Sequence, residues 1–189
     1  PMKLTPPVQE TSPFVTNDNF LTDWHLLGPF KFSETDFGGG MQNDSVDKEY
    51  VAGEENLDPS YPAPKETEWK VITSPGTRNA GEISFDDIYG NTDYAVVYAV
   101  TFVEMPCDMD GISLRVGSDD YIKVWLNGKI VLTYNKERRS SDWDQNIVKN
   151  ISLKKGLNRI VVKCVELSGG WSMYLRFTGR DGLPFKTEK

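Results

Sequence analysis

From residue 94 onward, the sequence is a succession of short segments in which large apolar residues alternate with other residues. The alternating positions are Tyr94, Val96, Tyr98, Val100 and Phe102, then Ile112, Leu114 and Val116, then Ile122, Val124 and Leu126. A period of two residues is that of a β-strand, whose side chains point alternately to the two faces of a sheet. The pattern therefore predicts consecutive strands, each with one bulky apolar face.

A turn signal separates two of these segments. The dipeptide Asn127-Gly128 lies between YIKVWL and KIVLTY. Both residue types tolerate the positive φ of a type I′ turn, so a two-residue β-hairpin is expected here. Further strands are expected in NIVKNISL, LNRIVVKCVEL and WSMYLRFT. About eight to ten short strands, with no amphipathic helix between them, predict an all-β jelly-roll sandwich.

The regions around this β-rich part have a different composition. Residues 1–19 are rich in Pro, Thr, Ser and Asn and are expected to be a linker or leader. Residues 20–185 are expected to form a single domain, and residues 186–189 a short tail. Within the domain, FLTDWHLLGPFKF predicts a short strand closed by Gly28-Pro29, and residues 33–67 predict a long irregular loop region.

The charge of the chain limits its partners. The formal net charge is −7, and such a field repels nucleic-acid phosphates and anionic lipid headgroups. No apolar run approaches the length of a membrane span, so membrane insertion is not expected. Acidic loops, in contrast, suit a hard cation such as calcium.

Few residues suggest catalysis. His25 is the only histidine, and its place within WHLLGPF favours a buried structural role over membership of a catalytic triad. The chain has none of the common catalytic motifs in a supporting context, so we expect no enzymatic activity from it. Cys164 lies in an apolar run, which favours a buried free thiol, but the sequence leaves open whether it bonds to Cys107.

Three blocks carry a family resemblance: WHLLGPF at 24–30, LRVGSDDYIKVWLNGKIV at 114–131, and LKKGLNRIVVK at 153–163 followed by GGWSMYLRF. Their order resembles that of the galactose-binding-like jelly-roll domains appended to many bacterial exported glycoside hydrolases and surface proteins. The middle block is also similar to the core of protective-antigen-type sugar-binding domains. It departs from that core at Tyr121, where glycine is usual, and at Asn127, where aspartate is common. The LGPF opening favours the galactose-binding-like family.

The resemblance implies a non-catalytic carbohydrate-binding module. Its partners would be a polysaccharide or oligosaccharide and a covalently linked neighbouring domain, and its location would be extracellular or periplasmic. The alternative is a structural spacer or protein-interaction domain without a ligand. Exposed Trp143 and Trp125 on one concave surface would favour sugar binding, and burial of every tryptophan would favour the spacer.

The candidate ligand-binding residues cluster in and near one loop. In KERRSSDWDQ, an indole flanked by charged groups suits a pyranose, because the ring stacks on C–H groups while the charges bind hydroxyls. Alternatively, Trp143 plugs the sandwich edge and the arginines are solvated. Trp171 shares its parity with core residues, and Trp125 either faces a concave sheet surface or packs under a loop. The full set is Arg138, Arg139, Trp143, Asp144, Tyr121, Trp125 and Trp171.

Two adjacent carboxylates, Asp119 and Asp120, are the candidate metal ligands. Carboxylate oxygens are the ligands that calcium prefers. In the protective-antigen-type domains the equivalent pair holds calcium, which in turn binds sugar hydroxyls, and the resemblance implies the same role here. Alternatively, Asp119 caps a turn and Asp120 pairs with a nearby arginine. No cofactor other than calcium is implied.

Overall fold

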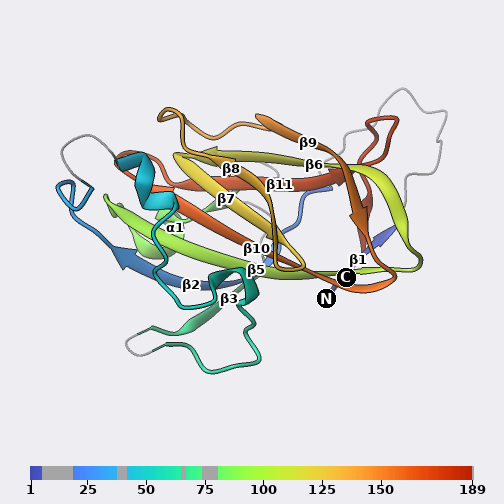
Figure 1. The fold of residues 1–189 in the computed structure, drawn as a ribbon, viewed down its shortest axis with the longest axis horizontal. Coiled ribbons are helices and arrows are strands. Elements are labelled where there is room, and N and C mark those ends of the chain that lie inside the picture. Colours follow the sequence, from blue (N-terminus) through green and yellow to red (C-terminus); the bar gives the residue numbers. More distant parts are fainter. Residues whose placement is uncertain (6–18, 38–41, 65–66, 74–80, 189) are drawn as a thin grey trace.

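The alternating segments form the strands of two sheets that pack face to face in the computed structural model (Figure 1), which describes residues 1–5, 19–37, 42–64, 67–73 and 81–188. The larger sheet has the order β12-β1-β5-β10-β7-β8, with β2 paired to β5 and β3 paired to β2. Its strands are β1 (Met2–Thr5), β2 (Asp23–Lys31), β3 (Trp69–Thr73), β5 (Ala95–Met105), β7 (Tyr121–Leu126), β8 (Lys129–Tyr134), β10 (Gly156–Glu166) and β12 (Lys186–Glu188).

The smaller sheet has the order β4-β11-β6-β9. Its strands are β4 (Ile83–Ser84), β6 (Met109–Asp119), β9 (Asn146–Leu153) and β11 (Ser172–Thr178). Helical structure among the described residues is limited to η1 (Gln42–Val46), η2 (Glu54–Asn56) and α1 (Asp86–Tyr89). The predicted all-β sandwich is therefore confirmed. None of the described helices is long and apolar enough to cross a membrane.

The period-two pattern divides each central strand between two cores. Val97, Ile122 and Cys164 point into the space between the sheets, where they join the main hydrophobic core. The intervening residues, among them Tyr98 and Trp125, point to the outer face of the larger sheet and belong to a second apolar cluster. Strands that are buried on both faces are thus apolar at successive positions, as β5 and β10 are.

The predicted hairpin is also confirmed. Asn127 and Gly128 have φ values of 51° and 79° and join β7 to β8, with Leu126 opposite Lys129. Positive φ at both central residues is the requirement of the type I′ turn, which explains the residue types found there.

The strands near both ends of the chain differ from expectation. Met2–Thr5, placed in the expected linker, forms β1 and pairs with β5 in parallel, while residues 186–188 of the expected tail form β12 and pair with β1. Met2 and Leu4 are buried in the main core, an alternation too short to detect in sequence. Residues 6–18 of the expected linker lie outside the described residues. β2 also continues past Gly28-Pro29 to Lys31, with a bulge between Leu27 and Phe30.

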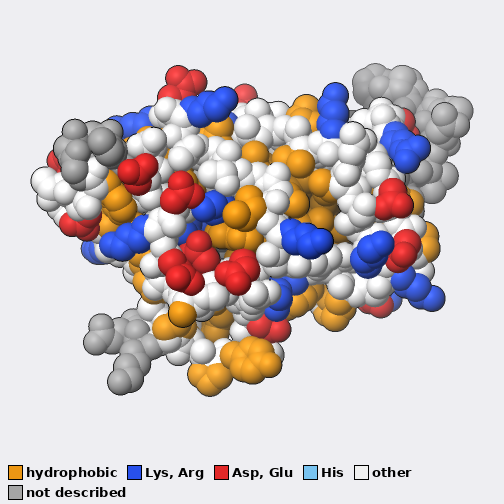
Figure 2. All heavy atoms as spheres, viewed as in Figure 1, with side chains coloured by type: hydrophobic (Ala, Val, Ile, Leu, Met, Phe, Trp, Pro, Cys, Tyr) orange, Lys and Arg blue, Asp and Glu red, His pale blue; other side chains and the backbone are white. Residues whose placement is uncertain are grey.

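A segment from residue 42 to residue 58, which we name the strap, covers the outer face of the larger sheet. Val46 and Leu57 of the strap pack into the second apolar cluster together with Trp125 and Tyr121 of β7. Over this segment, Figure 2 shows acidic side chains beside basic ones at the surface. The sheet face below the strap is therefore closed to solvent by the protein itself.

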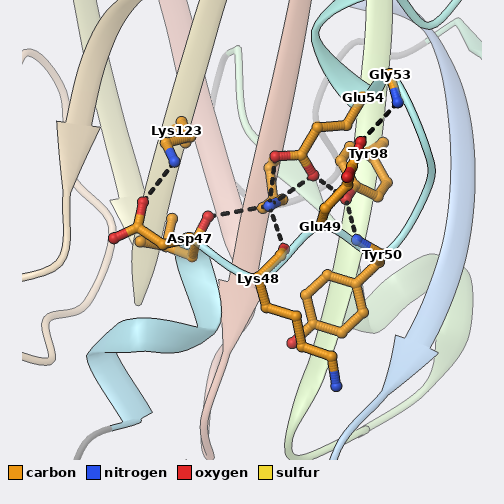
Figure 3. Close-up of polar contacts among 10 residues, drawn as sticks. Asp47, Lys48, Glu49, Tyr50, Gly53, Glu54, Tyr98 and Lys123 are labelled. Carbon is orange, nitrogen blue, oxygen red and sulfur yellow. Dashed lines mark hydrogen bonds and ion pairs between the residues drawn. The ribbon is translucent and has the colours of Figure 1, made fainter.

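The strap is attached through a fully buried lysine, Lys163, on β10. Its side chain is 0% exposed, and its ammonium donates to the carbonyl oxygens of Val46 (3.0 Å) and Lys48 (2.7 Å) and forms an ion pair with Glu54 (2.7 Å). Tyr98 donates its hydroxyl to the same Glu54 carboxylate, and Figure 3 shows Glu54, Glu49 and Tyr50 of the strap near Tyr98. Burial lowers the pKa of Lys163, and the Glu54 contact opposes that shift.

Removal of this lysine should loosen the strap. Lys163→Met leaves the Glu54 carboxylate buried without its cation, a change that typically costs about 3 kcal/mol. We expect the free energy of unfolding in urea to fall by about that amount, and the double variant Lys163→Met/Glu54→Gln to recover part of it. Lys149→Met, at an exposed position of β9, is the control and should change stability by less than about 0.5 kcal/mol. Equal effects at the two positions would contradict a role for Lys163 in holding the strap.

Candidate functional site

The two candidate metal ligands lie where the chain crosses from one sheet to the other. Asp119 is the last residue of β6 and pairs with Ser172 in the smaller sheet, while Tyr121 begins β7 and pairs with Val165 in the larger sheet. The Asp119-Asp120 peptide bond is cis, and the Asp120 amide donates to the Val165 carbonyl oxygen at 3.0 Å. This crossing brings Asp119 and Asp120 to the end of β10, where Glu166 is located.

Asp119, Asp120 and Glu166 form one buried carboxylate cluster. Each contributes an oxygen, and the three oxygens lie within 4.8 Å of one another. The Glu166 side chain is only 1% exposed, and within the described part of the protein neither of its oxygens has a hydrogen-bond partner. A buried carboxylate without a partner is costly, so this cluster is suited to a group that the chain itself does not supply.

Both oxygens of the Asp120 carboxylate, unlike those of Glu166, accept hydrogen bonds from the described residues of the protein. Its two oxygens accept from the backbone amides of Arg139 (3.2 Å) and Leu167 (3.1 Å), and the Nε of Arg138 lies 3.5 Å from Oδ2. The expected alternative of an arginine beside Asp120 is thus present in the structure. These contacts orient the Asp120 carboxylate and hold the two loops around the cluster, at 138–139 and at 167.

Carboxylates that lie close together and are buried favour their protonated, neutral form. Burial raises the pKa of Asp119 to about 7, and the charges of Asp120 and Asp86 add to the rise. Burial raises the pKa of Glu166 to about 9, with further contributions from Asp120 and Asp119. The charge of Arg138 opposes both shifts. A divalent cation would reverse them, because it stabilises the ionised carboxylates.

A glycine lies directly against the carboxylate of Asp119. A Cβ atom on Gly170 would lie 2.9 Å from Oδ2 of Asp119, closer than side-chain carbons normally approach. Position 170 therefore requires glycine, because any side chain there would press on the Asp119 carboxylate.

The loop 136–145 is held near its start by Arg139 and near its end by Asp144, both half-buried. Arg139 donates to the Ser118 carbonyl oxygen (3.1 Å) and to Asn146 (2.7 Å), and its guanidinium stacks on Tyr134 at 3.6 Å from the ring centre. Asp144, with φ of 55°, binds Arg115 (3.0 Å) and Arg176 (2.5 Å). Arg139 and Asp144 are therefore positioned to order the loop, and their charged groups are already engaged within the protein.

Trp143 lies between these two anchored ends and is 41% exposed. Its ring centre is 5.2 Å from that of Phe20, and the Arg176 guanidinium lies 5.6 Å from the indole. One part of the indole therefore packs on the protein, and the remainder is presented to solvent. This arrangement gives an aromatic surface of fixed orientation, which lowers the entropy lost when a ligand stacks on it.

The remaining candidate ligand-binding residues are in the interior. Tyr121 and Trp125 face the strap, and Trp171 is in the main core, where its backbone amide donates to Asp86 at 2.9 Å. Of the two alternatives for Trp125, packing under a loop is the one that the structure shows. Both cysteines are free, with Cys164 buried as expected. His25, expected to be buried, lies on β2 and is partly exposed.

Sequence reasoning missed Glu166. The available signal was an acidic residue near the end of the mainly apolar run VVKCVEL, because acidic residues are seldom fully buried unless they are paired. Nothing in the sequence indicates that β10 ends beside the crossing at residues 119–120, and that placement depends on the long-range pairing of β7 with β10.

No protein-family model and no curated protein matches the sequence. Similar solved structures include the PA14 domain of the antifreeze protein MpAFP (TM-score 0.37, 17% identity, 49% of this chain and 47% of that one). They also include a PA14 sugar-binding domain from an RTX adhesin (TM-score 0.48, 12% identity, 88% of this chain and 96% of that one). A third is a beta-glucosidase from Kluyveromyces marxianus (TM-score 0.43, 15% identity, 69% of this chain and 19% of that one). This chain thus spans less than half of the first structure and about a fifth of the third. PA14 domains are the protective-antigen-type domains that the middle sequence block resembles. The chemistry of the site has to come from its own residues.

The carboxylate cluster should make the metal-free protein sensitive to pH. The pKa values of Asp119 and Glu166 in the folded protein, about 7 and about 9, lie above the ordinary values of 3.8 and 4.5. The folded state therefore holds protons that the unfolded chain releases, and stability is lost as the pH rises through these values. In a chelator, we expect the free energy of unfolding to decrease between about pH 5 and pH 9.

Glu166→Gln should remove part of this pH dependence and, at about pH 8, stabilise the metal-free protein by roughly 1–3 kcal/mol. Urea denaturation at several pH values measures both quantities. A steeper loss of stability in the variant than in the wild type would contradict the assignment of the effect to Glu166.

Proposed function

We propose that the chain is a non-catalytic carbohydrate-binding module that holds a divalent cation, most simply calcium, at Asp119, Asp120 and Glu166. The observation that carries the proposal is the Glu166 carboxylate, buried beside two further carboxylates and lacking a hydrogen-bond partner among the described residues. The family resemblance of the 114–131 block is consistent with the same pair of aspartates. Glu166 is the member of the set that only the structure supplies.

The donor set suits calcium. Calcium takes six to eight oxygen ligands at about 2.3–2.6 Å and accepts irregular geometry. Three carboxylates provide only part of such a shell, so the remaining positions would be taken by water, backbone carbonyl oxygens or the hydroxyl groups of a ligand. A sugar with adjacent hydroxyls offers two oxygens at a suitable spacing, which is how a bound cation would recruit carbohydrate.

Trp143 supplies the second element of the proposed sugar contact. A pyranose has an apolar C–H face, and an exposed indole fixed by Phe20 and Arg176 offers a flat surface for it. Such a small contact gives weak binding, with an expected Kd of about 0.1–1 mM. In an extracellular or periplasmic protein, a covalently linked neighbouring domain would then gain avidity for polysaccharide through effective concentration.

Calcium binding is the first test of the proposal. Titration calorimetry with CaCl2 should show one site in the wild type and a loss of affinity of at least about tenfold in Glu166→Gln and Asp119→Asn. Glu137→Gln is the matched control, because Glu137 is an exposed acid of the neighbouring loop. Equal binding by all four proteins would place the cation elsewhere, and no binding by any of them would refute the cation site.

Gly170→Ala tests access to the same site. The new Cβ atom would press on Oδ2 of Asp119, so we expect calcium affinity to fall several-fold in the titration. Circular dichroism should show the same β-sheet content as the wild type. Calcium affinity equal to that of the wild type would mean that the cation approaches from another side.

Carbohydrate binding is tested separately, with a glycan array and polysaccharide affinity gels in calcium and in chelator. Trp143→Ala should abolish retention, because the stacking surface is lost, whereas Tyr61→Ala, an exposed aromatic outside this loop, should leave it unchanged. Retention that survives Trp143→Ala would move the sugar contact to another surface. No retention on a broad panel would favour the structural spacer instead.

The raised pKa values of Asp119 and Glu166 also favour a second candidate, a hydrolase with a general-acid carboxyl group. Two described pockets, of about 250 and 180 Å³, lie away from these acids, the first lined by His25 and Thr101 among others and the second by Lys3 and Glu104 among others. Release of reducing ends from the retained polysaccharide, lost in Glu166→Gln, would establish this alternative and overturn the non-catalytic role.

A further inference from the structure

Arg138 is the cation that faces the carboxylate cluster from the loop 136–145. Its Nε lies 3.5 Å from Oδ2 of Asp120, and its terminal amino group donates to the carbonyl and hydroxyl oxygens of Ser168. Its charge acts on Asp119 and Glu166 as well as on Tyr121. The guanidinium therefore spans the two loops that border the cluster and offsets part of its negative charge.

The two adjacent arginines of this loop differ in how firmly they are held. Arg139 donates to Ser118 and Asn146 and stacks on Tyr134, so it is fixed on several sides. The Arg138 side chain is 53% exposed, and its other contact is with Ser168, which immediately precedes Gly169-Gly170. A side chain that is half in water can leave its partners and be resolvated at a small cost, which the Arg139 side chain cannot do.

Arg138 and a divalent cation would need the same carboxylate. Oδ2 of Asp120 already accepts the Leu167 amide at 3.1 Å and lies beside the guanidinium. A cation that binds this oxygen would meet a positive charge a few ångströms away, and repulsion at that distance in a partly buried site is substantial. Either the cation is bound weakly or the arginine moves.

We propose that Arg138 is a displaceable internal counter-ion, which neutralises the carboxylate cluster when no metal is bound and leaves Asp120 when a divalent cation enters. The inference rests on the cation site proposed above. It assigns to Arg138 the role of a competitor that sets the calcium affinity.

The affinity test compares three proteins in calcium titrations at equal ionic strength. Arg138→Gln removes the competitor and should bind calcium about tenfold more tightly than the wild type. Lys136→Gln removes the same charge from an exposed position of the same loop and should change affinity less than twofold. Unchanged or weaker binding in Arg138→Gln would overturn competition while leaving the cation site intact, since the wild type would still bind and Glu166→Gln would not.

Displacement itself is measured on the arginine side chain. The Nε–H resonance of Arg138, assigned by its loss in Arg138→Gln, should change position and exchange faster with water in saturating calcium than in chelator, because the guanidinium leaves Asp120. A resonance that keeps its position and exchange rate while calorimetry shows calcium bound would overturn the proposal. Absence of calcium binding in both the wild type and Arg138→Gln would instead be a failure of the proposed cation site.

Discussion

A strand that is hydrogen-bonded along both edges and covered on both faces keeps its side chains out of water, and β10 is such a strand from Ile160 to Glu166. It lies between β5 and β7, with the main core on one face and the strap over the other. Charged residues there have to be compensated by the protein or by a bound ion. Between Ile160 and Glu166, β10 carries two buried charged residues, Lys163 and Glu166, and much of the architecture around them depends on how each is accommodated.

Lys163 is compensated within the described part of the protein, whereas Glu166 is not. The ammonium of Lys163 donates to two strap carbonyl oxygens and pairs with Glu54, so its hydrogen-bonding capacity is used entirely within the chain. The carboxylate of Glu166 meets Asp119 and Asp120, which have the same charge. The first arrangement builds structure, because it closes the second apolar cluster. The second is costly to stability, and such a cost is typical of a binding site.

How much the sequence could predict depends on whether the signal was local. Alternation in β5, β6 and β7 and the Asn127-Gly128 turn are local, and the strands and hairpin were predicted from them. The burial of Tyr121 and Trp125 was not predictable, because it depends on a strap some 70 residues earlier in the chain. Asp119 and Asp120 were visible as an adjacent pair, whereas Glu166 joins them only through strand pairing. In the loop, Arg139 and Asp144 have the residue types of a sugar contact, yet they bind their own chain.

The free thiol of Cys164 has a consequence of a different kind. Its sulfur lies 3.6 Å from the carbonyl oxygen of Asp119, beneath the carboxylate cluster, and burial raises its pKa well above the ordinary value, whereas Cys107 is exposed. A thiol reagent would therefore label Cys107 at once and reach Cys164 only when the sandwich opens at this end. The rate of the slow labelling phase therefore measures how often the interior below the cluster becomes accessible to the reagent.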